Sequence, residues 1–388
     1  MKRIILIIAV LAIMVSVVPA QTAISGVTPK DARSMGMGGA FRVFSDGYSS
    51  FFGNPAGFAG MGSLTLADLS TWAYIKPSTE TLEDLNKILD ENTSEADKAA
   101  ILGNMIGSNG FGAGTSIGAG WAGKGFALGA NVILDLPVAG AFPLSTKVKG
   151  VSQADLVLGF GIPIKMGPVG LKIGVDGRVF YRLNAPSSGW TFVDIAAALM
   201  GGSGFDDTLL QSLKLHAGYG FAADAGAVLN IGPLLLGFSV RDLGLAFKMK
   251  EISVYDVVQG GPASLPTDGT IPYTLTPQYA AGLGLRLFEN GLFEPSVYAE
   301  VEDPLELLKS SDIATDVFSK LHVGAQLRLL RFITARAGLN KGWMSVGAGI
   351  DLALFELDAA VFTEELGLYP GNKGRSGISI QAAIRFGR

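Results

Sequence analysis

The C-terminal part of the chain alternates apolar and polar residues with a period of two. Between 376 and 386, Ile378, Ile380 and Ile384 alternate with residues such as Ser379, Gln381 and Arg385. Successive side chains of a strand point to opposite faces, so this pattern predicts strands with one apolar face. The same alternation runs through 318–329, where the apolar residues are Leu321, Val323, Ala325, Leu327 and Leu329.

The first twenty residues have the features of a secretory signal peptide. Lys2 and Arg3 precede an apolar run from 4 to 18, and Val18-Pro19-Ala20 fits a cleavage site before Gln21. A membrane anchor is the alternative. The apolar run is short for an anchor and no basic flank follows it, so we expect an exported, cleaved chain.

Hydropathy favours a membrane protein that crosses the bilayer with strands. Hydrophobic residues make up 48% of the chain and the mean hydropathy is +0.39, yet no second spanning helix is predicted. The uncharged stretch 99–123 is interrupted by Gly and Asn, whereas a spanning helix needs about 20 predominantly apolar residues. A closed barrel is the other way to pair backbone polar groups in lipid. The apolar strand faces are therefore predicted to meet lipid.

The residue types exclude several classes of function. The chain has no Cys and a formal net charge of −4, which argues against a disulfide framework, a thiolate metal site and nucleic-acid binding. His216 and His322 are its two histidines, so no metal site and no cofactor are predicted. We expect no enzyme, because nucleophile, base and orienting group would all have to converge. Glu364 and Glu365 point to opposite faces of a strand, which favours a solvated rim over an acid–base pair.

The pattern predicts an all-β fold, a transmembrane antiparallel β-barrel of about fourteen strands. An even number is typical of bacterial single-chain barrels. The predicted strands are 63–74, 111–122, 125–135, 151–164, 169–183, 215–230, 234–249, 274–287, 292–302, 318–329, 332–339, 343–353, 355–365 and 376–386.

The connections between these strands alternate in length. Every even connection is tight, as at Gly123-Lys124, and six of the seven odd connections are long. Short periplasmic turns and long outer loops are typical of an outer-membrane barrel, and this places both termini on the periplasmic side. We expect helical insertions in the outer loops: one within 78–92, a second capped by Thr93 and running to Met105, and an apolar segment at 191–200.

With the apolar faces outward, the interior is polar. A paired, hydrated network and a polar conduction path are the two interpretations, and the first is favoured because ionised groups in confined spaces persist when paired. Inward glycines, Gly159 and Gly347 among them, leave room inside the barrel. The predicted lumen-lining residues are Lys172, Arg178, Asp224, Arg286, Glu300, His322, Arg328, Arg336, Asp351 and Glu356.

Residues 21–62 do not have the pattern of a strand. They contain a Gly cluster at 36–39, followed by Ala40-Phe41, and then Asn54-Pro55-Ala56-Gly57. The Gly cluster lacks the spacing and the βαβ context of a dinucleotide or phosphate loop, so we reject that function. Tight turns are predicted at Gly38-Gly39 and at Asn54–Gly57, because Gly is permissive and Pro fixes φ.

The two motifs in 31–57 resemble those of the FadL/TodX-type outer-membrane transport family, including its PorV-like and spirochaetal FadL-like relatives. The resemblance implies a fourteen-stranded barrel with the N-terminal segment folded into the lumen as a hatch. It assigns the hatch turn to Asn54, Pro55 and Ala56. The implied organisation is a signal peptide (1–20), a hatch (21–62) and a transmembrane barrel (63–388).

The resemblance implies uptake of hydrophobic small molecules, such as long-chain fatty acids, across the outer membrane. Outer-membrane lipid and the barrel-assembly machinery are the partners that such a barrel implies. The alternative is a non-transporting structural barrel or a barrel that serves secretion, with a periplasmic or surface protein as its partner. Fold alone does not choose between these functions.

Overall fold

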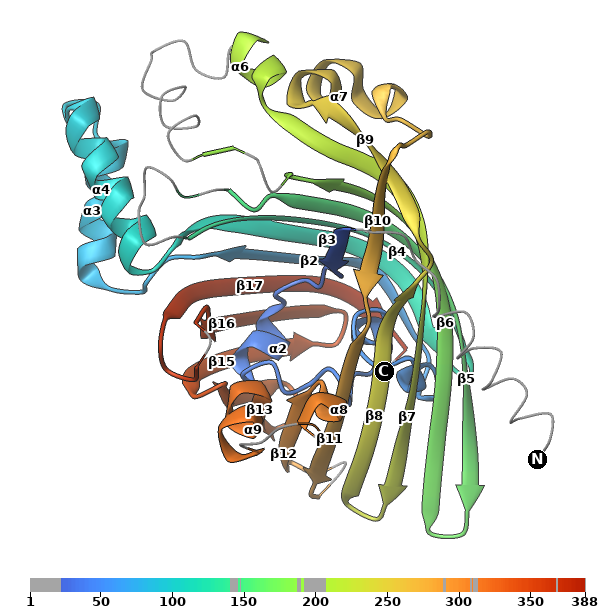
Figure 1. Ribbon diagram of the computed structural model, residues 1–388. Coiled ribbons are helices and arrows are strands. Elements are labelled where there is room, and N and C mark those ends of the chain that lie inside the picture. Colours follow the sequence, from blue (N-terminus) through green and yellow to red (C-terminus); the bar gives the residue numbers. More distant parts are fainter. Residues whose placement is uncertain are drawn as a thin grey trace.

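The computed structural model shows a closed antiparallel β-barrel (Figure 1). It describes residues 22–139, 146, 148–186, 190–191, 207–288, 291–307, 309, 313–367 and 369–387. Strands β2 to β8 and β11 to β17 pair with their neighbours in order, and two seams close the ring. In one seam β17 pairs with β2, and in the other β8 pairs with β11 from Arg241–Gln278 to Leu234–Leu285. The predicted fourteen-stranded barrel is confirmed.

The wall strands are long enough to cross a bilayer when tilted. In chain order they are β2 (Ser63–Ala73), β3 (Phe111–Gly123), β4 (Phe126–Val138), β5 (Val151–Met166), β6 (Val169–Asn184), β7 (Lys214–Ile231), β8 (Leu234–Gly244), β11 (Gln278–Arg286), β12 (Phe293–Glu302), β13 (Leu321–Leu329), β14 (Ile333–Asn340), β15 (Trp343–Leu352), β16 (Phe355–Glu365) and β17 (Gly374–Phe386).

Three further strands extend one side of the wall. β9 (Phe247–Ser253) and β10 (Ile271–Thr276) continue β8 and β11 and pair with each other. β1 (Thr22–Ser25) joins the free edge of β10 in parallel, with Thr22 opposite Tyr273. The end of the barrel with the long connections is called the loop end here, and the end with the tight turns is called the turn end. β1 lies in the half of the barrel that faces the loop end.

Two predicted strands are each divided in two by local chemistry. The strand expected at 234–249 is divided into β8 and β9. Near the end of β8 the register with β7 shifts at Asp242, which has φ +61° and whose backbone N–H donates to Asp224 Oδ1 at 2.7 Å. The strand expected at 274–287 is interrupted between β10 and β11 by Pro277, which has no N–H to donate.

Alternation along the strands separates an apolar exterior from a polar interior. On β16 and β17, Leu357 and Ile380 are 55% and 53% exposed, whereas their neighbours Asp358 and Gln381 are each 7% exposed. Large exposed apolar side chains recur on the outward face around the ring, for example Leu128, Leu158, Val175, Phe221, Leu283 and Val346. A continuous apolar exterior of this kind is typical of a lipid-facing barrel.

The connections have the predicted asymmetry. Tight turns join β3 to β4, β5 to β6, β7 to β8, β13 to β14 and β15 to β16, and Lys124 and Gly125 both have the positive φ of a hairpin turn. The connections at the other end are long, except between β14 and β15. The C-terminal strand ends at the turn end as predicted. The first described residues do not, because β1 pairs with β10 near the loop end, so the prediction that both termini lie on one side is wrong for Thr22.

Several of the long connections contain helices. α3 (Thr79–Leu89) is capped by Ser78, and α4 (Glu95–Ser108) is capped by Ser94 instead of the predicted Thr93. Residues 318–320, expected to begin a strand, are instead the last residues of α9 (Ile313–Lys320), and the strand starts only at Leu321. Residues 192–200 of the predicted apolar segment lie outside the described residues, as does the predicted signal peptide. The other helices of the long connections are α6 (Asp207–Ser212), α7 (Val254–Gly260), η4 (Gly261–Ser264) and α8 (Pro304–Leu307).

A capping box begins α7. The Ser253 hydroxyl and backbone N–H both bond to the Asp256 carboxylate at the start of α7, which lowers the pKa of Asp256. No helix in the described part of the chain combines the length and the apolar character needed to cross a membrane.

An arginine in the middle of the outward face should destabilise the protein in lipid. We expect Ile380→Arg on β17 to lower the free energy of unfolding by about 2–4 kcal/mol in lipid vesicles. Leu89→Arg, on a more exposed apolar side chain at the end of α3, should change it by less than about 0.5 kcal/mol. Urea titrations of both variants measure the difference. Equal tolerance at both positions would show that Ile380 faces water.

Candidate functional site

The N-terminal segment, residues 22–62, runs through the inside of the barrel (Figure 1). After β1, its backbone is held by inward side chains: Arg182 donates to the Ser25 carbonyl at 2.7 Å, and Lys30 forms an ion pair with Glu364 at 3.0 Å. It then forms α2 (Ala32–Gly36), η1 (Gly47–Phe51) and η2 (Pro55–Ala59) before entering β2. The segment is therefore an internal element enclosed by the strands.

The predicted turn at Gly38-Gly39 follows α2 and touches the wall. Both glycines have positive φ, +65° and +83°. A Cβ on Gly38 would lie 2.6 Å from the Leu339 carbonyl oxygen, and one on Gly39 would lie 2.9 Å from His322 Nδ1. Gly is required here both by the backbone conformation and by the close approach of β13 and β14.

Two predicted lumen residues hold the backbone that follows this turn. The buried Glu300 carboxylate accepts the N–H groups of Arg42 and Val43, each at 3.1 Å. His322 Nδ1 lies 2.7 Å from the Gly38 carbonyl oxygen. Acceptors supplied by the wall therefore satisfy N–H groups that would otherwise be buried without partners.

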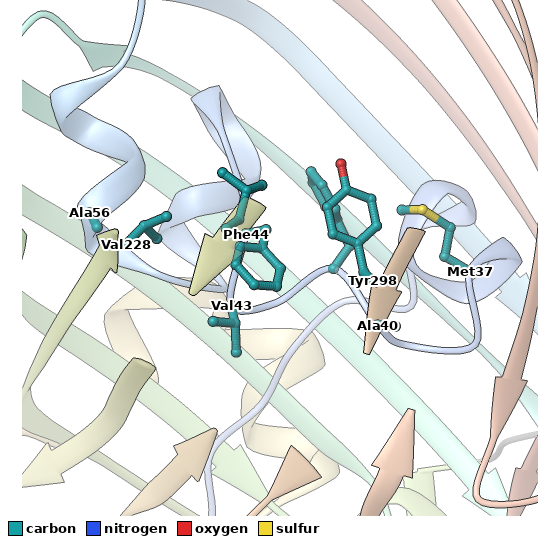
Figure 2. Close-up of a cluster of buried hydrophobic side chains, with 9 residues drawn as sticks. Met37, Ala40, Val43, Phe44, Ala56, Val228 and Tyr298 are labelled. Atoms are coloured by element: carbon teal, nitrogen blue, oxygen red, sulfur yellow. The ribbon is translucent and has the colours of Figure 1, made fainter. Parts of the chain in front are cut away.

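Apolar side chains of the same stretch form a cluster with the wall. Figure 2 shows Met37, Ala40, Val43 and Phe44 beside Tyr298 of β12. The Phe41 and Phe44 rings lie 5.6 and 5.5 Å from the Tyr298 ring, centroid to centroid. The cluster continues to Ala56, Val228 and Leu235, so it joins both halves of the segment to β7, β8 and β12.

The predicted Asn54–Gly57 turn is fully buried against β7 and β8. Asn54 Oδ1 accepts the Ala56 N–H at 2.9 Å and caps η2, which Pro55 begins. Asn54 Nδ2 donates to the Val43 carbonyl at 2.9 Å and to the Phe238 carbonyl at 3.1 Å. One side chain thus closes its own turn, links it to the earlier part of the segment and binds the wall. Gly57 is required by packing, since its Cβ would lie 2.0 Å from Ser50 Oγ.

Inward glycines of the wall make room for this segment. A Cβ on Gly174 of β6 would lie 2.0 Å from the Pro55 carbonyl oxygen, and one on Gly226 of β7 would lie 1.9 Å from Asn54 Oδ1. These two glycines are cross-strand partners. Further glycines whose added Cβ would overlap the segment are Gly118, Gly129, Gly159, Gly161, Gly237, Gly282, Gly324 and Gly338.

A layer of buried charge lies beside the Asn54–Gly57 turn. Arg178 forms ion pairs with Asp155 at 3.8 Å, Asp224 at 3.6 Å and Asp242. Arg241 pairs with Asp224 at 3.4 Å and donates to the Phe52 carbonyl of the segment. These side chains are at most 6% exposed and come from β5 to β8. They are a paired network, which is the interpretation that the sequence favours.

An apolar patch covers the inner wall on the loop side of this charge layer. Its buried members are Phe180, Ala222, Phe247, Met249, Tyr273 and Leu275, and the Phe180 and Phe247 rings meet edge to face at 5.2 Å. Ile24 of β1 packs against the patch. The first strand of the chain therefore covers an apolar surface inside the barrel.

A polar chamber of about 720 Å³ lies between the segment and the wall on the turn side. Its charges are largely paired, as in Arg328–Asp351 at 3.0 Å and Arg33–Asp46 at 3.0 Å. Arg286 donates to the Tyr298 hydroxyl at 3.0 Å. Six of the predicted lumen residues line this chamber: Lys172, Arg286, Arg328, Arg336, Asp351 and Glu356.

The ten predicted lumen residues therefore divide among three places. Glu300 and His322 contact the segment, Arg178 and Asp224 belong to the charge layer, and the other six line the chamber. The sequence reasoning missed Asp68, Arg241 and Asp242, because β2, β7 and β8 change register near them. A β-bulge interrupts the period-two alternation from which a residue is assigned to the inner or the outer face. An Asp inside an otherwise apolar strand, as at Asp68, is the signal that was available.

Both histidines contact other polar groups. His216 Nδ1 contacts the Tyr273 hydroxyl, and His322 bridges Gly38 and Glu302. Glu364 and Glu365 face opposite sides: Glu364 pairs with Lys30 and Arg375 inside, and Glu365 accepts the Trp343 indole N–H. In the described parts of the chain no group of three or more His, Asp or Glu is arranged to hold a metal ion.

Comparisons with known proteins give similarities in structure only. No protein-family model matches the chain, and no curated protein matches it. Solved structures similar to it include two toluene transporters and a FadL homologue. The toluene transporter TodX of Pseudomonas putida is 12% identical, with a TM-score of 0.44 over 92% of this chain and 98% of that chain. A FadL homologue of Pseudomonas aeruginosa is 13% identical, with a TM-score of 0.43 over 95% and 100%. The toluene transporter TbuX of Ralstonia pickettii is 14% identical, with a TM-score of 0.45 over 92% and 98%.

A side chain at Gly174 should displace the Asn54–Gly57 turn. We expect Gly174→Val to cost about 1–3 kcal/mol of local stability through overpacking, so that amide exchange at 54–58 becomes about tenfold to a hundredfold faster. Gly177→Val is the matched control, because a Cβ at this outward glycine of the same strand meets no atom within 4 Å. Equal exchange rates in the two variants would show that the turn does not depend on the Gly174 contact.

The Glu300 carboxylate should matter as an acceptor more than as a charge. Glu300→Ala leaves the Arg42 and Val43 N–H groups without their partner, at a cost of about 1–3 kcal/mol. Glu300→Gln keeps an acceptor oxygen and should cost less. Denaturant unfolding in detergent gives the order of the two variants. A larger loss in the Gln variant would contradict this assignment.

Proposed function

We propose that this protein is an outer-membrane barrel for the uptake of hydrophobic small molecules, with residues 21–62 as its hatch. The observation that carries the proposal is the layered interior. An apolar patch lies on the loop side, the N-terminal segment and the charge layer lie in the middle, and the polar chamber lies on the turn side. A polar barrel interior does not need an apolar surface for its stability, but such a surface suits the binding of an apolar ligand.

The orientation follows from the connections. Long loops are found on the outer side of bacterial barrels and short turns on the periplasmic side. The apolar patch then faces the outside of the cell, and the chamber opens toward the periplasm. A hydrophobic molecule arriving from outside would replace Ile24 on the patch, since both offer the same kind of apolar contact. Partners in this function are the ligand, outer-membrane lipid and the barrel-assembly machinery.

The hatch assignment rests on the contacts of the segment. Asn54 and the Gly38-Gly39 turn tie it to β7, β8, β13 and β14, and the wall glycines are complementary to it. Its attachment is by hydrogen bonds, ion pairs and side-chain packing, with no Cys in the chain to fix it covalently. Such an element can move without breaking the ladder of the wall strands.

Deleting residues 31–57 should open the lumen. We expect the deletion barrel to assemble, as judged by heat-modifiable gel mobility, and to conduct ions in planar bilayers at a higher single-channel conductance than the mature chain. Removal of the segment leaves the interior filled by water and by the paired charges of the wall. Conductance no greater than that of the mature chain would leave the segment as a tail with no gating role.

Ligand binding should depend on the apolar patch. We expect Leu275→Gln to weaken the binding of a fluorescent long-chain fatty acid to the detergent-purified protein. Lys172→Ala, on the opposite side of the segment, should leave binding unchanged. Mass spectrometry of small molecules extracted from the wild-type protein identifies the natural ligand class. No bound lipid, together with copurification of a stable protein partner, would favour the non-transporting alternative.

A further inference from the structure

One buried carboxyl group in the charge layer lacks a hydrogen-bond partner among the described residues. Asp176 of β6 is 6% exposed, and among the residues that the structure describes neither of its carboxyl oxygens accepts a hydrogen bond. Its neighbours Asp155, Asp224 and Asp242 are all paired with Arg178. An ionised carboxylate that is buried without a partner is strongly unfavourable, whereas a neutral acid is tolerated.

The charges around Asp176 do not compensate for it. Asp224 on β7 is its direct cross-strand partner, and a facing pair of this kind has Cβ atoms about 4.5–5.5 Å apart. The other charged groups of the layer are Asp155 of β5, Arg178 of β6, and Arg241 and Asp242 of β8. Arg182 of β6 also interacts electrostatically with Asp155 and Asp242, so four carboxyl groups, Asp176 included, share three guanidinium groups. One protonated carboxyl group reduces this excess.

The N-terminal segment closes off the wall around Asp176. Gly159 is the cross-strand partner of Asp176 on β5, and the Phe58 ring lies where its Cβ would be. Gly174, two residues earlier on β6, lies under Pro55, and Gly226 on β7 lies under Asn54. Residues 54–58 thus cover the three wall positions next to Asp176. Moving the segment away would expose the carboxyl group to the water of the lumen.

We propose that Asp176 carries a proton when the N-terminal segment is docked, so that docking is coupled to the uptake of one proton. A carboxyl group that binds its proton more tightly in the docked state favours docking at lower pH. Rising pH ionises Asp176 opposite Asp224, and the segment is released. The proposal depends on the docking of the segment and not on transport.

The test measures docking directly with a single thiol. The chain has no Cys, so Ser50→Cys, at a 1% exposed position of the segment, provides one buried reporter. Met61→Cys, at a 77% exposed position, provides the reference for the intrinsic pH dependence of the thiol. The measured quantity is the ratio of their labelling rates with a water-soluble maleimide between pH 6 and pH 9. It is compared with Asp176 present and with Asp176→Asn, which mimics the neutral acid.

With Asp176 present, the ratio should rise with pH by up to about tenfold per pH unit, the limit for linkage to one proton. In the Asp176→Asn background it should stay low and rise less. His322, which contacts Gly38, is another titratable side chain at the segment, so the difference between the two backgrounds carries the test. Heat-modifiable gel mobility checks folding, and Asp176→Ser serves as a second neutral variant.

Coincident pH profiles in the two backgrounds, or a flat profile with Asp176 present, would overturn the proton coupling. Labelling of Ser50→Cys as fast as Met61→Cys at every pH would show that the segment is not docked, and would overturn the hatch assignment as well. A failure of fatty-acid binding would affect neither result, so the two proposals are tested separately.

Discussion

The structure depends on the inverted polarity of its wall. The outward side chains are mostly apolar, so lipid contact is favourable, and most charges in the middle of the wall strands are directed inward. Such charges persist in a confined interior only when they are paired or hydrated. Most of these charges pair with one another, as Arg178 does with three aspartates. The others line the chamber or bind the backbone of the N-terminal segment. The requirement for an apolar exterior and paired interior charges thus accounts for both the barrel and the layers inside it.

The segment and the wall are complementary in shape as well as in hydrogen bonding. The segment supplies large side chains such as Phe51 and Phe58, and the wall supplies glycines such as Gly129 and Gly159 opposite them. Glycine weakens a strand when it faces an empty space, because no side chain packs there. Here the missing side chains are replaced by those of another part of the chain. The wall is thus adapted to an occupied interior, and its inner face cannot be understood from the strands alone.

Much of this arrangement was predictable from the sequence, since it rests on local periodicity. The alternation in 376–386 gave the correct faces, and the tight turns with positive φ, such as Lys124-Gly125, gave the correct ends. Predictions were wrong where a proline, a bulge or a helix interrupts the alternation of side chains between the two faces of a strand. Pro277 divides one strand, the bulge at Asp242 turns two consecutive residues inward, and a helix precedes Leu321. The three places of the lumen residues were not predictable, because they depend on the path of the segment between strands distant in sequence.

The parallel pairing of β1 with β10 determines where the start of the described chain is found. The segment enters the wall at Ser63 on the turn side, but it begins at Thr22 near the loop end, so it traverses the lumen lengthwise. A label attached at Thr22 would therefore lie near the long loops and not beside the end of the C-terminal strand. Thr22 and the end of β17 thus lie near opposite ends of the barrel, although β2 and β17, the first and last wall strands, lie side by side.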